Sequence, residues 1–406
     1  MTRYYGWRMV WALAVTQTVG FGVLYYAFSV FVTPMETELG WTRAQTSGAF
    51  SLALLLSGVG ALPAGRFVDK HGARGLMSVG SLLGALLVFA WSGVQSLAVF
   101  YLIQGAIGLV MATVLYDVAF TVVAVWFRRD RARALLIVTL VAGLASTIFI
   151  PLTTFLTEAF GWRDALKVLA LILGVTTVPL HAVVLRRHPR DLGVEPDGVP
   201  TTASPPPAER SVRPAEALRT ATFWWLSSAF SLARITMIAV IAHIVPLLSE
   251  RGYTPTTVAA AAGSIGLFQL AGRLFFMPAT GRISLVRFTA VTFGFYAVAL
   301  LTLLLLPGVA SVWLFAALFG MANGAGTLAR AALVADTFGA GHYGSINGAM
   351  ATLIAVVQTV APIGAGLLHD AFGSYTPVLW TLVGVSGLAV LLVVQVQPQK
   401  EVAYAD

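Results

Sequence analysis

Long, uninterrupted apolar segments constrain this chain more than any other feature of its sequence. A helix that crosses a membrane needs about 20 consecutive, mostly apolar residues, and segments of that length recur along the whole 406-residue chain. Hydrophobic residues make up 58% of the sequence and charged residues only 10%, well below the roughly 25% that is usual for a soluble domain. The sequence therefore predicts an all-α membrane protein.

Twelve transmembrane helices are predicted, joined by short connections with one exception. That exception, residues 186–221, is rich in arginine and contains Pro205-Pro206-Pro207, so it has the composition of a polar linker without a core. It divides the chain into a first bundle (1–185), the linker (186–221), a second bundle (222–396) and a short tail (397–406). The predicted spans are 8–35, 44–66, 75–92, 98–126, 134–157, 164–185, 222–248, 256–280, 286–306, 311–335, 343–368 and 376–396.

The basic residues predict the orientation of these spans. The termini, the linker and every second loop together carry 18 of the 25 Lys and Arg residues, and the opposite side carries four. Cytoplasmic loops hold the excess of positive charge, so both termini are expected in the cytoplasm. The chain is expected to be a multi-pass protein of the inner membrane of the cell. The net charge of +8 is then a topology signal, and no nucleic-acid partner is predicted. The 18 include Arg3, Arg210 and Lys400.

Several kinds of chemistry are not expected. The chain has no cysteine and only six scattered histidines, with no HExxH or HxxxH spacing. No metal site, no cofactor and no pairing of a nucleophile with a base at helical spacing is predicted. An enzyme is therefore not expected.

The connection between the second and third spans carries the most specific motif. It reads Gly65-Arg66-Phe67-Val68-Asp69-Lys70-His71-Gly72-Ala73-Arg74. Gly65 would let helices approach closely, Gly72 would permit a tight turn, and Asp69 would cap the following helix or pair with a cation on a moving neighbour. A degenerate copy of this motif, residues 281–287, follows the eighth span and contains no acidic residue.

This order of residues resembles the loop signature of the major facilitator superfamily. The resemblance implies two pseudo-symmetric six-helix bundles that rock about a mid-membrane site, in a transporter that functions as a monomer. It also implies a conformational switch loop made of Gly65, Asp69, Lys70, Gly72 and Arg74.

A finer resemblance concerns the monocarboxylate and oxalate/formate porter branch. It rests on Gly6-Trp7-Arg8, on Gly40-Trp41-Thr42-Arg43 and on Gly272-Arg273-Leu274. In that branch the arginine of the eighth span binds the substrate carboxylate, so the resemblance implies this role for Arg273. Gln269 stands where eukaryotic members carry an aspartate, and the first and eleventh spans contain no lysine.

Four charged residues, Asp117, Arg234, Arg273 and Arg330, lie within otherwise apolar segments of the predicted spans rather than in the first turn or at the edge of a span. Each costs at least roughly 2.5–3.5 kcal/mol on insertion scales. Asp117 and Arg234 lie near mid-membrane. Asp117 either couples a proton or substrate to transport or forms a permanent salt bridge with Arg234 or Arg330, and Arg234 either binds substrate or is that partner. Arg330 is close to one end of its span, so it either contributes to the site or is explained by snorkelling or by a pair with Asp336.

Uncharged polar residues could complete a pocket. The candidates are Gln17, Tyr26, Tyr116, His243 and Asn323. Such residues also join helices by hydrogen bonds, and His243 could instead satisfy a carbonyl near Pro246.

Three intramembrane arginines against one aspartate favour an anionic substrate. We therefore expect a secondary transporter that moves a small organic anion together with a proton by alternating access. Two alternatives remain open: proton-linked efflux of a drug or an anionic metabolite, and, more remotely, a membrane sensor without transport.

Overall fold

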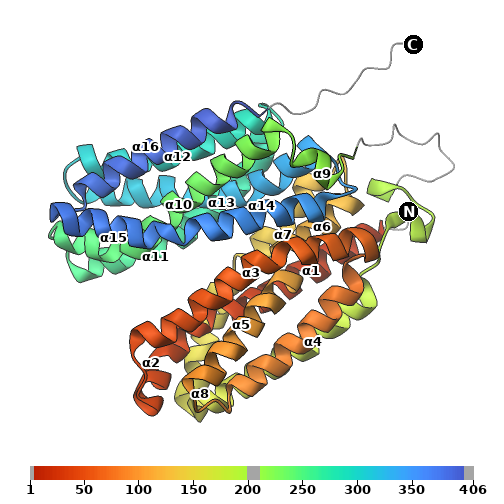
Figure 1. Ribbon diagram of the computed structural model, residues 1–406, viewed down its shortest axis with the longest axis horizontal. Coiled ribbons are helices and arrows are strands. Elements are labelled where there is room, and N and C mark those ends of the chain that lie inside the picture. Colours follow the sequence, from red (N-terminus) through yellow and green to blue (C-terminus); the bar gives the residue numbers. More distant parts are fainter. Residues whose placement is uncertain (1–3, 199–210, 397–406) are drawn as a thin grey trace. The chain divides into compact units, whose positions relative to one another are not determined.

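The computed structural model describes residues 4–198 and 211–396, drawn as ribbons in Figure 1. These residues form helices and connecting segments and contain no β-strand. Arg3, Arg210 and Lys400, which entered the orientation argument, lie outside the described residues, as do 199–210 of the predicted linker and the predicted tail 397–406.

The helices follow the predicted spans closely, although several spans are broken into two elements. Before the linker they are α1 (Tyr5–Phe21), η1 (Gly22–Tyr26, a π-helix), α2 (Phe28–Leu39), α3 (Arg43–His71), α4 (Ala73–Trp91), α5 (Leu97–Val114), α6 (Tyr116–Trp126), α7 (Arg131–Ala142), α8 (Ala145–Pro179) and η2 (Leu180–Val184). In and after the linker they are η3 (Pro189–Leu192), η4 (Pro196–Gly198), α9 (Pro214–Ala217), α10 (Ala221–Glu250), α11 (Pro255–Thr280), α12 (Leu285–Leu305), α13 (Val309–Phe338), α14 (Tyr343–Gln358), α15 (Val360–Phe372) and α16 (Thr376–Val393).

The described residues contain eleven helical stretches long and apolar enough to cross a membrane. One of them, Arg131–Val184, is 54 residues long, more than twice what one crossing needs. It is interrupted at Gly161, whose backbone (φ 79°, ψ 159°) lies far from helical values. Divided there, it covers the predicted span 134–157 and all but the last residue of the predicted span 164–185, and the count becomes the predicted twelve.

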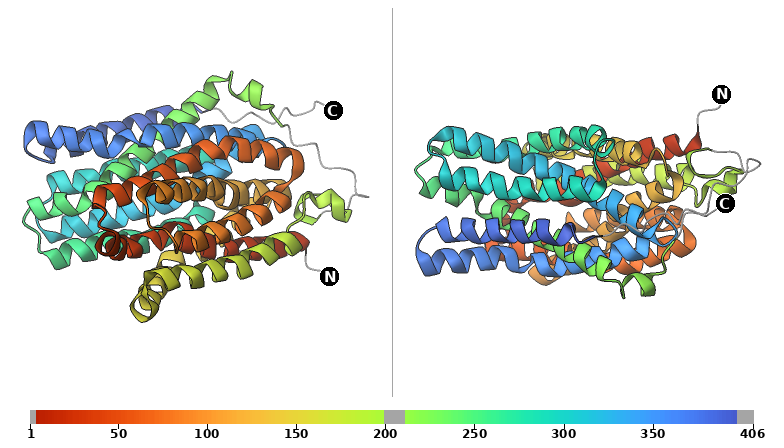
Figure 2. Two further views of the ribbon diagram at one scale, coloured as in Figure 1. Left: turned by 60° about the horizontal axis from the view of Figure 1, so that its bottom comes forward. Right: turned by 90° about the horizontal axis from the view of Figure 1, so that it is seen from above.

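Contacts divide the chain into two compact units. The first comprises Met1–Ser211 and Ala340–Ala355, and the second comprises Val212–Gly339 and Val356–Asp406. Within each unit, long helices run alongside one another in both views of Figure 2. The boundary between the units falls inside α14, so the first turns of this helix belong to the first unit although the predicted domains follow chain order. The division into compact units by contacts differs in kind from the predicted division at the linker, and the predicted domain boundaries remain a prediction.

Glycines bring the helices close together inside each unit. A Cβ atom on Gly108 of α5 would lie 2.2 Å from the carbonyl oxygen of Ala53 on α3. In the second unit a Cβ on Gly324 of α13 would lie 2.0 Å from the carbonyl oxygen of Gln269 on α11. Without aqueous solvent between helices, such close packing is a main source of helix association in membranes.

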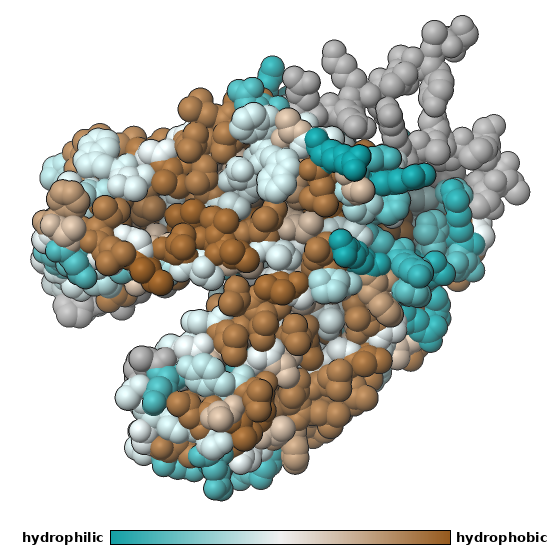
Figure 3. Space-filling model, in the orientation of Figure 1, coloured by the Kyte–Doolittle hydropathy of each residue, from teal (hydrophilic) through white to brown (hydrophobic). Residues whose placement is uncertain are grey.

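Large apolar side chains cover much of the outer surface. Phe155 and Leu171 of α8 are 63% and 65% exposed. On the face drawn in Figure 3, hydrophobic residues cover the helices and hydrophilic residues gather at their ends and around the linker. This distribution suits helices surrounded by lipid.

Candidate functional site

The fourth predicted span is broken near its middle. Helix α5 ends at Val114, Leu115 is extended (φ −89°, ψ −163°), and α6 begins at Tyr116. The carbonyl of Val114 accepts a hydrogen bond of 2.7 Å from Nε2 of Gln17 on α1. Gln17 is fully buried and thus satisfies a carbonyl that the break releases. Discontinuous helices of this kind hold irregular backbone at membrane depth.

Asp117 lies in the first turn of α6, immediately after this break. A carboxylate is favoured at this position because the amide groups of a helix N-terminus carry partial positive charge. Its Oδ1 accepts a hydrogen bond of 2.9 Å from Nδ2 of Asn347 on α14. Asn347 is only 1% exposed and belongs to the part of α14 that packs in the first unit.

Aromatic rings surround the break. The ring of Tyr116 lies 4.5 Å from that of Phe21 at the end of α1, and ring contacts continue from Phe21 through Tyr25 to Tyr26 in η1. π-Helical turns occur frequently at functional sites. The structure therefore brings the predicted residues Gln17, Tyr26 and Tyr116 to one region of the first unit, around the N-terminus of α6.

Arg234, on α10 in the second unit, makes two hydrogen bonds to uncharged side chains. Its Nε donates to Oε1 of Gln358 at 2.8 Å, and its Nη1 lies 3.1 Å from the sulfur of Met237. Gln358 is the last residue of α14.

Arg273 lies on α11 in the same unit and is only 7% exposed. Its neighbour Gly272 packs against α13 so closely that a Cβ there would lie 2.1 Å from the carbonyl oxygen of Met321. The predicted residue Asn323 belongs to the same part of α13 and is 8% exposed. Arg330, two turns further along α13, is half-buried. Arg273 is therefore a buried residue beside the tight crossing of α11 and α13.

His243 joins α10 to its neighbours. Its Nε2 lies 3.0 Å from the carbonyl oxygen of Pro362, and its Nδ1 lies 3.0 Å from the hydroxyl of Tyr375. A carbonyl only accepts, so a neutral ring with its proton on Nε2 donates to Pro362 and can accept from the tyrosine through Nδ1. The carbonyl that His243 satisfies is thus that of Pro362 rather than one near Pro246.

Asp69, in the predicted switch loop, caps the N-terminus of α14, a helix far from it in the sequence. Its Oδ1 accepts from the backbone amide of Gly344 at 2.9 Å, and its Oδ2 accepts from the amide and the hydroxyl of Ser345 at 2.7 and 2.5 Å. The expectation that it caps the following helix is wrong, because α4 begins after Gly72 without a side-chain cap. Asp69 lies one turn after Gly65 on the face of α3 that packs against α14.

That packing of α3 against α14 depends on small residues. A Cβ on Gly65 would lie 1.9 Å from the carbonyl oxygen of Gly344, and one on Gly348 would lie 2.4 Å from that of Ala61. Further along, the hydroxyl of Thr352 donates to the carbonyl of Gly58 at 2.7 Å. Because the residue numbers fall along α3 while they rise along α14, the two helices run antiparallel.

The other residues of the switch loop hold the end of the sixth span. Nε of Arg74 donates to the carbonyl of Ala182 at 2.7 Å, and the carbonyl of Lys70 accepts from Nη2 of Arg187 at 2.7 Å. A Cβ on Gly72 would lie 2.7 Å from Cγ of Arg187. Gly72 has φ +81°, which only glycine adopts easily.

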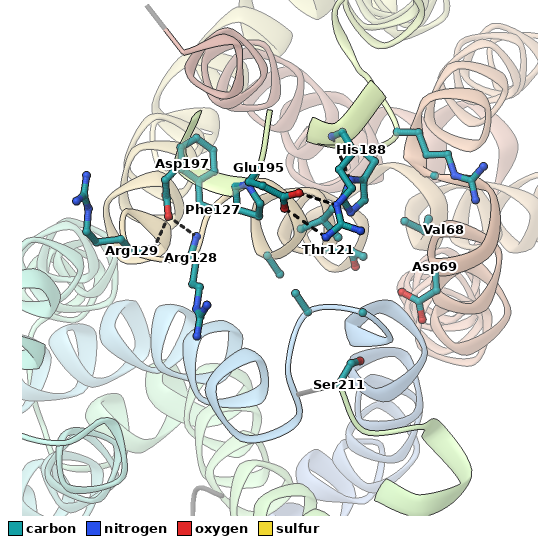
Figure 4. A pocket seen from close by; sticks show the side chains of 18 residues that line it. Val68, Asp69, Thr121, Phe127, Arg128, Arg129, His188, Glu195, Asp197 and Ser211 are labelled. Carbon is teal, nitrogen blue, oxygen red and sulfur yellow. Dashed lines mark hydrogen bonds and ion pairs between the residues drawn. The ribbon is translucent and has the colours of Figure 1, made fainter. Parts of the chain in front are cut away.

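The first part of the linker folds against the first unit and forms one wall of a pocket of about 510 Å³ (Figure 4). The carboxylate of Asp197 accepts from the backbone amides of Arg128, Arg129 and Asp130 at 3.1, 2.7 and 3.2 Å. Asp197 has φ 61° and is the one non-glycine residue with positive φ among the described residues. Residues 186–198 are thus an ordered structure, which their composition did not predict.

Metal ligands are not clustered in the described part of the chain, where no group of three His, Asp or Glu side chains could hold an ion. Two polar partners in these regions, Asn347 and Gln358, were not predicted. Both are amides inside the apolar eleventh span, and that placement is the signal which could have identified them.

Comparison with known proteins gives consistent results. The sequence model of the Major Facilitator Superfamily matches residues 10–352 and, in a second and overlapping match, residues 224–404. The oxalate:formate antiporter of Oxalobacter formigenes is 26% identical over 282 residues, which is 68% of this chain and 63% of that relative, just under two thirds of its length. Monocarboxylate transporter 12 of Rattus norvegicus is 26% identical over 397 residues, which covers 92% of this chain and 81% of that relative.

The fold is also similar to a solved structure. The crystal structure of FucP, a transporter of the same superfamily, in the outward conformation matches with a TM-score of 0.75 at 12% sequence identity. The match covers 97% of this chain and all of that one.

Proposed function

The chain belongs to the Major Facilitator Superfamily, and we propose that it carries a small, monocarboxylate-like organic anion across the membrane together with a proton. As a member of this family it is a multi-pass membrane transporter and not an enzyme. The nature of the cargo, the coupled proton and the residues that bind them are the proposal.

The buried guanidinium of Arg273 carries the proposal. Arg273 is 7% exposed in a helix that is apolar enough to cross a membrane, and charged residues at such positions commonly mark a substrate or ion pathway. A guanidinium presents a planar fork of donors that matches a carboxylate in two parallel hydrogen bonds. Similarity to proteins named as an oxalate:formate antiporter and as monocarboxylate transporters supports the same class of cargo.

Arg234 is proposed as the second cationic group that attracts the anion. Its Nε donates to Gln358, and this hydrogen bond would orient the guanidinium before the substrate arrives. Tyr26, Tyr116, Gln17, Asn323 and Arg330 are proposed to shape the pocket, whereas His243 is engaged by Tyr375 and Pro362 and contributes by holding α10.

Asp117 is proposed as the group that takes up the proton. It is an acidic residue in the middle of a predicted span, at a break between two helices. Each unit charge that crosses the membrane potential is worth about 2.3 kcal/mol per 100 mV. Binding a proton together with a monovalent anion removes this energy, so the two can cross as a neutral pair.

We also propose that both termini and the linker are cytoplasmic, in the inner membrane of the cell, and that the monomer is functional. The two predicted bundles, 1–185 and 222–396, would move relative to each other as substrate and proton bind. Asp69 and the rest of the switch loop would then stabilise one of the alternating conformations through the N-terminus of α14.

A binding screen tests the proposed cargo. Purified protein is heated in detergent with monocarboxylates, dicarboxylates, phosphonates or hydrophobic drugs, because a ligand that binds the folded state raises the denaturation midpoint. We expect a monocarboxylate to raise the midpoint of the wild type but not that of Arg273→Ala. Arg282→Ala, which removes an exposed arginine between α11 and α12, should respond like the wild type. Stabilisation by drugs alone, equal in all three proteins, would refute an anionic cargo.

A further inference from the structure

One turn of α14 contacts α3 and α6 through two different carboxylates. Gly344 and Ser345 donate to Asp69, and Asn347 donates to Asp117. The donors lie only about 4.5 Å apart along the helix axis, at 1.5 Å per residue. The same turn is therefore bound both to the switch loop and to the carboxylate that we propose as the proton carrier.

Asn347 is suited to respond to the charge of Asp117. It is 1% exposed, and while its Nδ2 donates to Asp117, its Oδ1 is buried and accepts no hydrogen bond from any described residue. A hydrogen bond to an ionised carboxylate is roughly twice as strong as one between neutral groups. Neutralising Asp117 would therefore weaken the bond that compensates for burying this amide.

Two other contacts of this part of α14 are made by groups other than Asp117. Gly65 and Gly344 approach each other through backbone atoms, and Thr352 donates to the carbonyl of Gly58. Neither contact contains a group whose charge changes when Asp117 is neutralised. The hydrogen bond from Asn347 therefore adds to the packing of α14 a contribution that depends on the charge of Asp117.

We propose that Asn347 is a positioning residue through which the charge of Asp117 controls how firmly the first turns of α14 attach to α3 and α6. When Asp117 is ionised, Asn347 holds α14 in place and supports the capping of its N-terminus by Asp69. When Asp117 is neutral, this attachment loosens. The inference rests on the proposed function, in which Asp117 takes up a proton.

A cysteine reporter on α14 measures this attachment directly. The chain contains no native cysteine, so Ala351→Cys creates a single thiol one turn after Asn347, at a position that is 6% exposed. The rate at which a maleimide labels this thiol in purified full-length protein rises with the fraction of time that α14 is detached. Asp117→Asn supplies the neutral form of Asp117 without a change of pH.

The test is a double-mutant cycle in the reporter background. We expect Asp117→Asn and Asn347→Leu each to raise the labelling rate about five- to tenfold, because about 1–1.4 kcal/mol of attachment is lost. Together they should raise it little further, within about twofold, because both remove the same contact. Asn347→Ser, which keeps a small polar group, should lie between Asn347→Leu and the wild type.

Thr352→Val is the matched control on the same helix. It removes a hydrogen bond to Gly58 that does not involve Asp117, so its effect on labelling should multiply with that of Asp117→Asn. An unchanged labelling rate in Asp117→Asn would overturn the proposal. So would multiplication of the effects of Asp117→Asn and Asn347→Leu.

The labelling cycle separates this inference from the proposed function, because labelling requires no substrate. If the cycle shows the expected coupling and no carboxylate is carried, the proposed cargo is wrong and the role of Asn347 stands. If a carboxylate is carried with a proton and the cycle shows no coupling, the role of Asn347 is wrong and the proposed cargo stands.

Discussion

Asp69 and Gly344 are 275 residues apart in the sequence, and the backbone amide of Gly344 donates to Oδ1 of Asp69 at 2.9 Å. The end of α3 thereby supplies the N-terminal cap of α14, together with two further hydrogen bonds from Ser345. The first amides of a helix have no partner within the helix. A carboxylate satisfies them and also interacts favourably with the helix dipole.

Replacing this carboxylate should destabilise the protein. Asp69→Asn keeps the size of the side chain but removes its charge and one acceptor oxygen, so we expect a loss of about 1.5–3 kcal/mol, the usual range for hydrogen bonds to charged groups. Ser345→Ala removes a single donor and should cost about 1 kcal/mol or less. The midpoint of thermal denaturation in detergent measures both. Equal midpoints for Asp69→Asn and the wild type would contradict the capping role.

Gly65 should not tolerate a side chain. Its Cβ would lie 1.9 Å from the carbonyl oxygen of Gly344, so Gly65→Ala must push α3 and α14 apart, at a cost of about 1–3 kcal/mol. Gly75→Ala is the matched control, because a Cβ on Gly75 of α4 would meet nothing within 4 Å. Alanine there should be neutral or stabilise the helix by up to about 1 kcal/mol. Similar denaturation midpoints in the two variants would contradict the close approach.

The sequence predicted the fold because each crossing is encoded locally. Every span is a long apolar segment, and the one discrepancy in their number arises at Gly161, where two crossings form a continuous stretch. The motif around Asp69 and the apolar residues around Arg273 can also be recognised from a short stretch of sequence.

The partners of these residues could not be predicted in the same way. Asp69 meets Gly344, and Asp117 meets Asn347, because particular faces of α3, α6 and α14 come together across large sequence separations. The break at Leu115 was equally hidden, since no proline or glycine marks it and a side chain from α1 satisfies the released carbonyl. Such features depend on packing rather than on local periodicity.

The attachment of the linker to the first unit should depend on Asp197. Asp197→Ala removes the acceptor for three backbone amides and places alanine at φ 61°, a conformation that disfavours residues other than Gly, Asn and Asp. We expect trypsin to cleave after the exposed Arg190 about tenfold faster in this variant, which corresponds to about 1.4 kcal/mol. Asp197→Asn keeps one acceptor oxygen and should be cleaved at a rate closer to that of the wild type. Identical cleavage of Asp197→Ala and the wild type would exclude this anchoring role.

His188 should make stability depend on pH. Burial, together with the positive charge of Arg190, lowers the pKa of His188 from its usual 6.5, so the folded protein favours the neutral ring. This contribution is present above about pH 6.5 and is lost as the pH falls through the lower pKa of the folded state. The denaturation midpoint should therefore decrease more between about pH 7.5 and about pH 5 in the wild type than in His188→Asn, which keeps an acceptor for the amide of Arg190. Parallel curves would rule this contribution out.

Transport in proteoliposomes tests the central claim most directly, namely that a small organic anion crosses together with a proton. The carboxylate that stabilises the wild type in the binding screen is followed with and without an imposed pH gradient. We predict gradient-driven accumulation in the wild type, no transport in Arg273→Ala, and loss of accumulation with retained exchange in Asp117→Asn. Accumulation in Asp117→Asn with the same dependence on the gradient as in the wild type, or carboxylate transport that survives Arg273→Ala, would contradict the account.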